Sequence, residues 1–391
     1  MSDHESVERP NLDDANDVIE RLEWADGAKE DTPHKRWRDL TRRTALTGGA
    51  AGLATLILEA CGGGKKSSST GTTSAAAQGG TPAAGVFGNQ KKMKFVFVNH
   101  VTTNPFFVPT RYGAEDACKI LGCSYQWTGS ESSNVREMVN AFNSAQTAGA
   151  NGIAVALVDL KAFNAPTQKA LDAKIPVVGY NADAAGNARL AYIGQDLFVS
   201  GQEMGKRIVE LVPSGDVALF IATPGSLNIQ PRIDGAIDSI KKSGKGIKYH
   251  TVATGAAVPK ELSTIDAYWQ GHQNTKGMFA VDGGSTASVA QVMKKYNLPG
   301  KGVKAGGYDL DPKTQALLAA GQIDFTIDQQ PYLQGFLPVL ELYMINASGT
   351  LTGPGDVNTG LKFLDKTSIV PYNDTKSRYE GTSSSAGVTK G

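Results

Sequence analysis

Short apolar runs recur along the middle of the chain, and stretches with helical spacing separate them. Val135, Met138, Phe142 and Ala145 show this spacing, because residues three or four apart share one face of a helix. The apolar runs are KFVFVN from Lys94, GIAVAL from Gly152, IPVVGY from Ile175, GDVALFIA from Gly215, KYHTVA from Lys248, KGMFAVD from Lys276, GVKAGGYD from Gly302 and DFTID from Asp324. Strands that are apolar throughout and alternate with helices predict an α/β fold with parallel sheets covered on both faces.

The first sixty residues have a different pattern. Arg42 and Arg43 precede a weakly apolar run, TGGAAGLATLILEA, which is too short to span a bilayer stably and which ends at Cys61. A basic pair, a short apolar run and small residues at its exit indicate an export signal. We therefore predict a cytoplasmic leader and export signal over 1–60, a flexible Gly/Ser/Thr/Ala linker over 61–92 and a disordered polar tail over 372–391.

The paired arginines resemble a twin-arginine signal, and LEAC, ending at Cys61, resembles the lipobox of bacterial lipoproteins. The second resemblance implies that Cys61 carries a lipid anchor, so that the mature protein lies in the periplasm or at the outer face of the cytoplasmic membrane. The Sec route stays open, because Ala45 stands where the twin-arginine pattern favours a large apolar residue. A start codon further downstream also stays open, since the leader is long and acidic.

Composition restricts the class of partner. The chain has 391 residues, 40% of them hydrophobic and 20% charged, with a net charge of +1. This composition is typical of a globular protein, and the length leaves room for two lobes with substantial cores. A net charge near zero gives no electrostatic reason to expect a nucleic acid partner.

Polar side chains follow six of the predicted strands at the point where each strand ends. In parallel sheets, ligands bind outside the carboxyl ends of the strands. Each residue alone has a structural explanation, because Asp and Asn also cap helices and begin turns. Six such exits together favour a binding site, and the residues concerned are Asn99, Asn104, Asn181, Asp183, Arg232, Asp282, Asp309 and Gln329.

One of these exits places two aromatic residues directly after a buried strand. In NHVTTNPFF, Asn104 and Pro105 precede Phe106 and Phe107. The rings either fill the core side of a helix or form a platform for a ligand, and a sugar ring has an apolar C–H face that packs on such a platform. Pro105 sets the backbone angle of the first helical turn and so aims both rings.

From Met93 to about Pro371 the sequence resembles the ribose-type (type I) periplasmic binding proteins, the solute-binding subunits of sugar ABC transporters. The resemblance implies two doubly wound parallel-sheet lobes, joined by a hinge, with the ligand in the cleft between them. It places one lobe at 93–195 plus 330–355 and the other at 196–329 plus 356–371. The segments that carry it are FVFVNHVTTNPFFVPTRYGAEDACKILG, AKIPVVGYNAD, AYIGQDLFVSGQEMGKRI, IATPGSLNIQPRIDGA, FAVDGG, AGGYD and TIDQQP.

The same resemblance implies the ligand-binding residues. Asn104 bonds a sugar hydroxyl, Phe106 and Phe107 form an aromatic wall, and the Arg232 fork donates to two adjacent hydroxyls. The alternative for Arg232 is a surface salt bridge. The other predicted ligand-binding residues are Asn181, Asp183, Asp282, Asp309 and Gln329.

The identity of the sugar stays open, because one segment departs from the family pattern. Many sugar binders carry Asp-Arg where this chain has Asn181-Ala182-Asp183, so a fixed cation is missing. A ribose, a hexose, a polyol such as inositol and a furanoside signal all fit. Three carboxylates against one arginine disfavour an anionic ligand.

We predict an extracytoplasmic lipoprotein, a monomer without cofactor, that delivers a neutral monosaccharide or small polyol to the permease and ATPase subunits of an ABC importer. A receptor that feeds a chemosensor is the alternative, because both use the closed form. The sensing core of a LacI-type repressor shares the fold, but such a chain begins with a DNA-binding helix-turn-helix. An enzyme is disfavoured, because GxxxxGK[ST], GxGxxG and HExxH are absent and five scattered histidines lack metal-ligand spacing. Cys118 and Cys123 fit either a disulfide or two small buried thiols.

Overall fold

The computed structural model describes residues 92–349, 355–385 and 389–390, which form two α/β lobes. The predicted export signal, with Arg42 and Arg43, and the predicted lipidation residue Cys61 lie outside the described residues. No helix in the described ranges combines the length and the apolar character needed to cross a bilayer.

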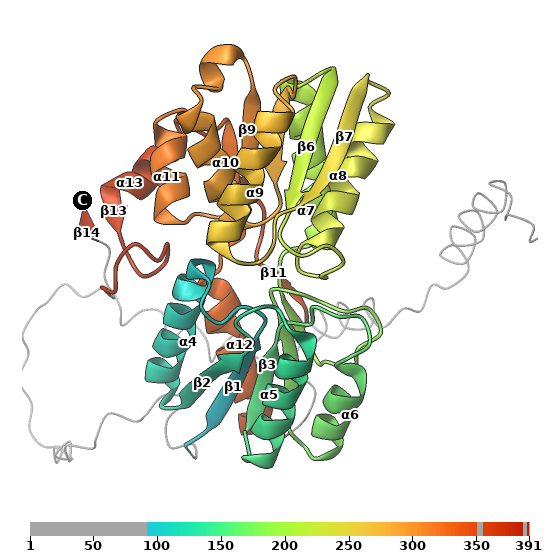
Figure 1. Ribbon diagram of the computed structural model, residues 1–391. Coiled ribbons are helices and arrows are strands. Elements are labelled where there is room, and N and C mark those ends of the chain that lie inside the picture. Colours follow the sequence, from blue (N-terminus) through green and yellow to red (C-terminus); the bar gives the residue numbers. More distant parts are fainter. Residues whose placement is uncertain (1–91, 350–354, 386–388, 391) are drawn as a thin grey trace, which may run out of the picture. The chain divides into compact units, whose positions relative to one another are not determined.

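The first lobe is built on a six-stranded parallel sheet with the order β11-β5-β4-β3-β1-β2 (Figure 1). Its strands are β1 (Lys94–Asn99), β2 (Ser124–Gly129), β3 (Gly152–Val155), β4 (Val177–Tyr180), β5 (Tyr192–Gly194) and β11 (Val357–Asn358). Its helices are η1 (Pro105–Phe107), α4 (Val108–Leu121), α5 (Val135–Thr147), α6 (Asn164–Asp172) and α12 (Leu333–Ser348).

The second lobe repeats the plan with the strand order β12-β10-β9-β8-β6-β7, in which only β12 runs antiparallel to its neighbour. Its strands are β6 (Gly215–Ile221), β7 (Ile247–Ala253), β8 (Gly277–Ala280), β9 (Lys304–Tyr308), β10 (Phe325–Asp328) and β12 (Lys362–Leu364). Its helices are α7 (Leu197–Leu211), α8 (Gln230–Lys242), α9 (Val258–Gly271), α10 (Gly283–Lys295), η2 (Pro299–Lys301), α11 (Pro312–Ala319) and α13 (Val370–Asp374). Two short strands, β13 (Thr375–Lys376) and β14 (Thr389–Lys390), pair with each other.

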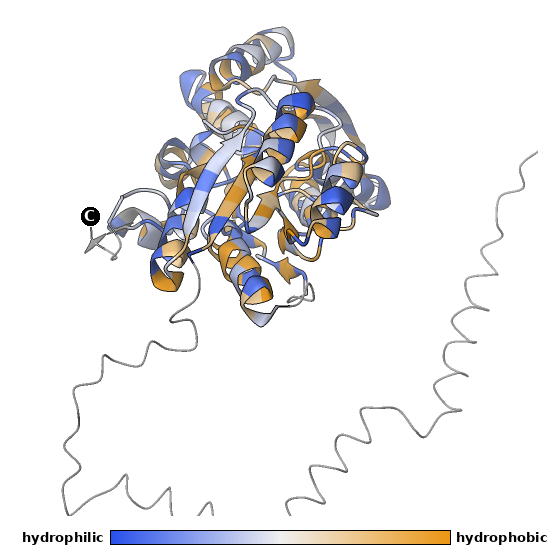
Figure 2. Ribbon diagram, turned by 90° about the horizontal axis from the view of Figure 1, so that it is seen from below, coloured by the Kyte–Doolittle hydropathy of each residue, from blue (hydrophilic) through white to orange (hydrophobic). Residues whose placement is uncertain are grey.

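The central strands are apolar throughout because both faces of each sheet are covered. In β6, Val217 and Leu219 enter one core cluster, whereas Ala218 and Phe220 enter another on the opposite face. Successive side chains of a strand point to opposite faces, so a strand between two helical layers needs apolar residues at every position. Figure 2 shows the apolar colour concentrated on central strands, while the helices carry both colours.

Within the described residues the chain crosses between the lobes three times, and the three crossovers bond to one another. Thr359 donates its backbone N–H to Gly194, 2.9 Å away, and its hydroxyl to the carbonyl of Gln329, 2.8 Å away. The side chain of Gln195 donates to the carbonyl of Gly360 at 3.0 Å. These bonds join the crossovers into one hinge.

The structure moves one predicted lobe boundary. The sequence assigned 356–371 to the second lobe, but β11 pairs with β5 of the first sheet, with Val357 opposite Ile193. Asp356 fixes this strand, because its carboxylate accepts the backbone N–H of Tyr192 at 2.7 Å and pairs with Arg189. The third crossover therefore lies after β11, at Thr359 and Gly360.

The expected disordered tail over 372–391 is also different in the structure. Residues 372–385 pack against the folded unit, and both Ser377 and Arg378 are buried. Polar composition predicted disorder, but the buried Arg378 forms ion pairs with Glu115 and Asp116 of α4. Such tertiary partners are not visible in local composition.

Candidate ligand-binding site

A small cavity of about 40 Å³ lies at the strand ends and is bordered by both lobes. A volume of this size has room for roughly one or two water molecules, so a sugar can enter only if side chains or lobes move. Larger hollows exist, one of about 430 Å³ among them. We assign the small cavity because the polar residues predicted from the strand exits meet there. Its lining residues are His100, Asn104, Phe106, Phe107, Asn181, Asn228, Ile229, Arg232, Asp282, Gly283, Asp309 and Gln329.

The Asn104–Phe107 segment divides its side chains between capping, core and cavity. The side-chain oxygen of Asn104 accepts the backbone N–H of Phe106 at 2.9 Å, which begins η1 and leaves the amide donors of Asn104 for other partners. Phe107 is only 2% exposed and belongs to the first-lobe core, where its ring meets that of Phe106 edge-on. Phe106 is partly exposed. The ring of Phe107 therefore fills the core of the first lobe, whereas the ring of Phe106 is the more accessible of the two for a ligand.

Asn181 presents a buried acceptor to the site. It follows β4 with a φ of 63°, and its side-chain N–H donates to Oε1 of Gln334 at 3.2 Å. The Oδ1 atom is buried and has no hydrogen-bond partner. Leaving such a group unsatisfied costs about 1–3 kcal/mol, which a hydroxyl donor would recover.

Arg232 lies in the first turn of α8 and is 2% exposed. Its guanidinium donates to the carbonyl of Val281 at 2.9 Å and to Oε1 of Gln195 at 3.0 Å. The group lies 4.1 Å from the centre of the Tyr308 ring, and its Nε is buried without a partner. The guanidinium group of Arg232 is thus buried and fixed in position, and it does not form a surface salt bridge.

Asp309 and Gln329 form one hydrogen-bonded pair. Nε2 of Gln329 donates to Oδ1 of Asp309 at 2.7 Å, and both side chains are buried. Burial raises the pKa of Asp309 to about 7, although the nearby positive charge of Arg232 opposes the shift. Gly283 makes room for this carboxylate, because a Cβ there would lie 2.9 Å from Oδ2.

Asp282 is both a helix cap and a cavity residue. Its Oδ1 accepts the backbone N–H of Ser285 at 2.9 Å, and its Oδ2 accepts that of Ala222 at 3.0 Å. Behind it lies Glu261, 2% exposed, whose pKa is raised well above its usual range by burial and then by the charge of Asp282. A carboxyl group that is harder to ionise adds less negative charge beside the cavity.

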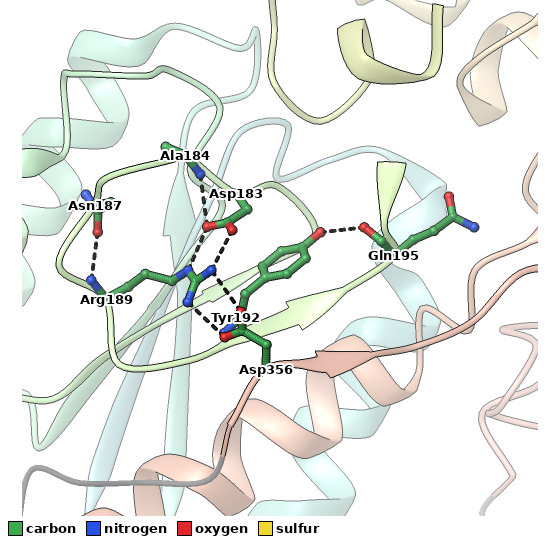
Figure 3. A network of polar contacts seen from close by, with 7 residues as sticks. All are labelled: Asp183, Ala184, Asn187, Arg189, Tyr192, Gln195 and Asp356. Carbon is green, nitrogen blue, oxygen red and sulfur yellow. Dashed lines mark hydrogen bonds and ion pairs between the residues drawn. The ribbon is translucent and has the colours of Figure 1, made fainter. Parts of the chain in front are cut away.

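Of the residues named at the strand exits, Asn99 and Asp183 do not border this cavity. Asn99 is buried and donates to the hydroxyl of Tyr180 at 2.8 Å, whereas Asp183 pairs with an arginine. Figure 3 shows the carboxylate of Asp183 facing Arg189, with Nε–Oδ1 and Nη2–Oδ2 distances of 2.6 and 2.5 Å. The other side of the guanidinium contacts Asp356, 2.9 Å away. Arg189 therefore fixes β11, and Asp183 holds Arg189. The cavity is left with two carboxylates, Asp282 and Asp309, against one guanidinium.

His100 and Asn228 also border the cavity, and the sequence analysis missed both. Nδ2 of Asn228 lies 3.0 Å from Nε2 of His100, and Oδ1 of Asn228 accepts the hydroxyl of Ser226. Burial lowers the pKa of His100 to about 4, so its ring is neutral. An amide nitrogen can only donate, so Nε2 accepts and the buried, unpartnered Nδ1 carries the proton. The available signal was position, because His100 follows the first strand and Asn228 precedes Arg232.

A third missed residue, Gln334, connects the site to the hinge. It is fully buried, accepts from Asn181, and donates to Gln329 and to the hydroxyl of Thr359.

Cys118 and Cys123 are free thiols in the structure, so the disulfide alternative is not formed there.

Residues 95–349 match the family described as periplasmic binding protein domain. The chain belongs to this family. The match and the two parallel-sheet lobes confirm the predicted type I periplasmic-binding-protein fold. Members of the family bind solutes rather than transform them, in agreement with the prediction that the chain is not an enzyme.

Similar proteins include binding proteins for several sugars. The xylose/arabinose-binding protein XylF of Sulfolobus acidocaldarius is 49% identical over 367 residues, which cover 88% of this chain and 90% of XylF. The D-allose-binding periplasmic protein of Escherichia coli K12 is 26% identical over 253 residues, covering 61% of this chain and 79% of that protein. An ABC transporter solute-binding protein from Burkholderia graminis, solved with D-arabinose, has a TM-score of 0.67 and 25% identity over 72% of this chain and 98% of its own.

Proposed function

We propose that this protein captures a neutral monosaccharide in the cavity between its lobes, with pentoses such as xylose and arabinose as the ligand class. The observation that carries the proposal is the set of unsatisfied buried polar atoms around the cavity. Oδ1 of Asn181 can accept a hydrogen bond, whereas Nε of Arg232 and Nδ1 of His100 can donate one, and each of these three atoms is buried without a partner. A polyhydroxylated ring supplies both donors and acceptors and would satisfy all three.

The charge at the cavity supports a neutral ligand. Arg232 faces Asp282 and Asp309, and the raised pKa of Asp309 brings the sum of charges closer to zero at neutral pH. An anion would meet two carboxylates, and a cation would meet a buried guanidinium. The pentose class rests on the similarity to XylF, which is named for xylose and arabinose.

We propose further that the protein is exported, is anchored through a lipid on Cys61, and delivers its ligand to the permease and ATPase subunits of an ABC importer. The sequence LEAC before a Gly/Ser-rich linker supports the anchor. The Burkholderia graminis structure, described as an ABC transporter protein, supports the delivery role.

A thermal-shift screen of the purified full-length chain tests the ligand class. D-xylose, L-arabinose, D-arabinose, D-ribose, hexoses and inositol should be compared with amino acids and nucleosides. A ligand at about 100 times its Kd should add roughly 2.7 kcal/mol to the free energy of unfolding. The proposal is wrong if no sugar or polyol raises the melting temperature while an amino acid or a nucleoside does.

A further inference from the structure

The segment 372–385, here called the C-terminal strap, contacts both lobes. It begins within α13 of the second lobe, where Tyr372 packs against the core cluster that contains Ile369 and Leu364. Figure 1 shows α13 beside α11 of that lobe. At its other end the strap reaches α4 of the first lobe, so it connects the lobes in addition to the three crossovers.

Arg378 is the anchor of the strap on the first lobe. Its side chain is 6% exposed, and it pairs with Glu115 at 2.6 Å and with Asp116 at 3.1 Å. The guanidinium lies 4.2 Å from the centre of the Tyr112 ring, and Nη1 donates to the carbonyl of Ser384 at 2.9 Å. One buried cation thus has two carboxylates, an aromatic face and a carbonyl as partners, which is more than a single surface ion pair provides.

Two neighbouring contacts support this anchor. Tyr332, at the start of α12, donates its hydroxyl to Asp116 at 3.0 Å. The ring of Tyr379 packs edge-on against the Tyr332 ring, with 4.8 Å between the ring centres. Gly381 has a φ of 73° and approaches Pro109 so closely that a Cβ would lie 2.8 Å from the proline Cδ. The strap backbone is therefore fitted against the start of α4.

The strap also borders the binding region. The hollow of about 430 Å³ is lined by strap residues Tyr372, Tyr379 and Glu380 on one side and by Phe106 on another. Phe106 also lines the small cavity. The strap therefore lies next to the wall of the ligand site, on one edge of the region where the lobes meet.

We infer that Arg378 is a positioning residue for ligand capture, which acts by holding the two lobes in the arrangement that forms the site. The site needs both lobes, because its lining residues come from each of them. An interaction that is lost when the lobes separate slows the opening of the sugar-bound form, and so raises the apparent affinity by slowing dissociation. The affinity part of this inference rests on the proposed sugar-binding function, whereas the part on lobe closure does not.

Amide hydrogen exchange on the ligand-free full-length chain tests closure. The backbone N–H of Leu227 donates across the lobes to Val158 at 3.0 Å, whereas that of Ile153 donates within the first lobe to Pro176. In Arg378→Ala, exchange in the peptide containing Leu227 should become several-fold faster, with the Ile153 peptide unchanged. Arg207→Ala is the matched control, because Arg207 pairs with Glu210 on the surface of the second lobe; both peptides should exchange as in wild type.

Sugar affinity is the second measurement. Arg378→Ala should bind the sugar about ten-fold more weakly through faster dissociation, and Arg378→Lys, which keeps the charge, should recover part of the loss. A lower melting temperature with unchanged Leu227 exchange and unchanged affinity would overturn the inference, because the strap would then only stabilise the fold. If Leu227 exchange becomes faster in Arg378→Ala but the wild-type protein binds no sugar, the role of Arg378 in lobe closure stands and the proposed sugar-binding function is wrong.

Discussion

His100 and Asn228 lie in different lobes, and their side-chain nitrogens Nε2 and Nδ2 are 3.0 Å apart. Beside this pair, the backbone of Leu227 donates to Val158, so a loop of the second lobe bonds to the first lobe at two points. These bonds exist only while the lobes are together. The two residues therefore line the cavity together only when the lobes are closed.

A double-mutant cycle should detect this contact in ligand binding. We expect His100→Ala and Asn228→Ala to be non-additive in sugar affinity, with a coupling of about 0.5–1.5 kcal/mol, because each removes the same hydrogen bond. Calorimetry on the two single variants and the double variant measures it. Gln202→Ala and Asp238→Ala form the control cycle, since their 2.8 Å bond lies within the second lobe. Additive effects at His100 and Asn228 would show that the contact does not take part in binding.

The raised pKa of Asp309 predicts a pH dependence of stability. The folded protein holds the proton up to about pH 7, whereas an unfolded aspartate releases it near its ordinary pKa. This contribution to the free energy of unfolding is therefore fully present below about pH 4 and is lost as the pH rises to about 7. Asp309→Asn removes the titration and keeps an oxygen that accepts from Gln329. Denaturant unfolding at pH 4 to 8 should show that the free energy of unfolding of the variant rises relative to that of wild type as the pH rises. If the difference between the two free energies stays constant over this range, the pKa of Asp309 is not raised.

Asp183 should act on stability and not on binding. Both of its oxygens accept from Arg189, so Asp183→Ala releases a guanidinium that is 16% exposed and loosens β11. We expect a loss of about 1–3 kcal/mol in the free energy of unfolding with unchanged sugar affinity. The matched variant Asn181→Ala removes an acceptor at the cavity and should weaken binding. If Asp183→Ala weakens binding as strongly as Asn181→Ala does, then Asp183 contacts the ligand after all.

Membrane attachment should depend on Cys61. The LEAC sequence before a flexible linker predicts that Cys61→Ser leaves the protein in the soluble fraction after cells are broken and membranes are pelleted. The matched control is Cys123→Ser, which changes a free thiol of the folded unit and should remain with the membranes. If the Cys61 variant stays as fully membrane-bound as wild type, the lipoprotein proposal is wrong.

The sequence predicted much of the cavity because its residues are tied to local signals. Asn104, Asp282 and Asp309 each follow an apolar run that becomes a strand, and the ends of parallel strands meet at one edge of a sheet. His100 occupies the same kind of position, but a lone histidine gave no chemical signal. Its role emerged only through Asn228, which the fold brings in from the other lobe.

Partners distant in sequence caused the differences. Asp183 looked like a ligand residue because it follows β4, yet its carboxylate pairs with Arg189, which also binds Asp356 and so stabilises the first lobe. The polar tail looked disordered because the partners of Arg378 lie more than 260 residues earlier in the chain. Neither pairing leaves a trace in local composition or periodicity.

Titration calorimetry of D-xylose and L-arabinose into wild type, Asp309→Ala and Arg232→Ala tests whether a sugar binds in the cavity between the lobes. The cavity predicts one site per chain in wild type. Each variant leaves buried partners unsatisfied, so binding should weaken by roughly ten- to several hundred-fold. Phe106→Leu keeps apolar volume but loses the flat ring, and should cost only about 0.5–1.5 kcal/mol. Circular dichroism should show that each variant is folded. Wild-type affinity in both Asp309→Ala and Arg232→Ala would contradict the account, because the sugar would then bind elsewhere.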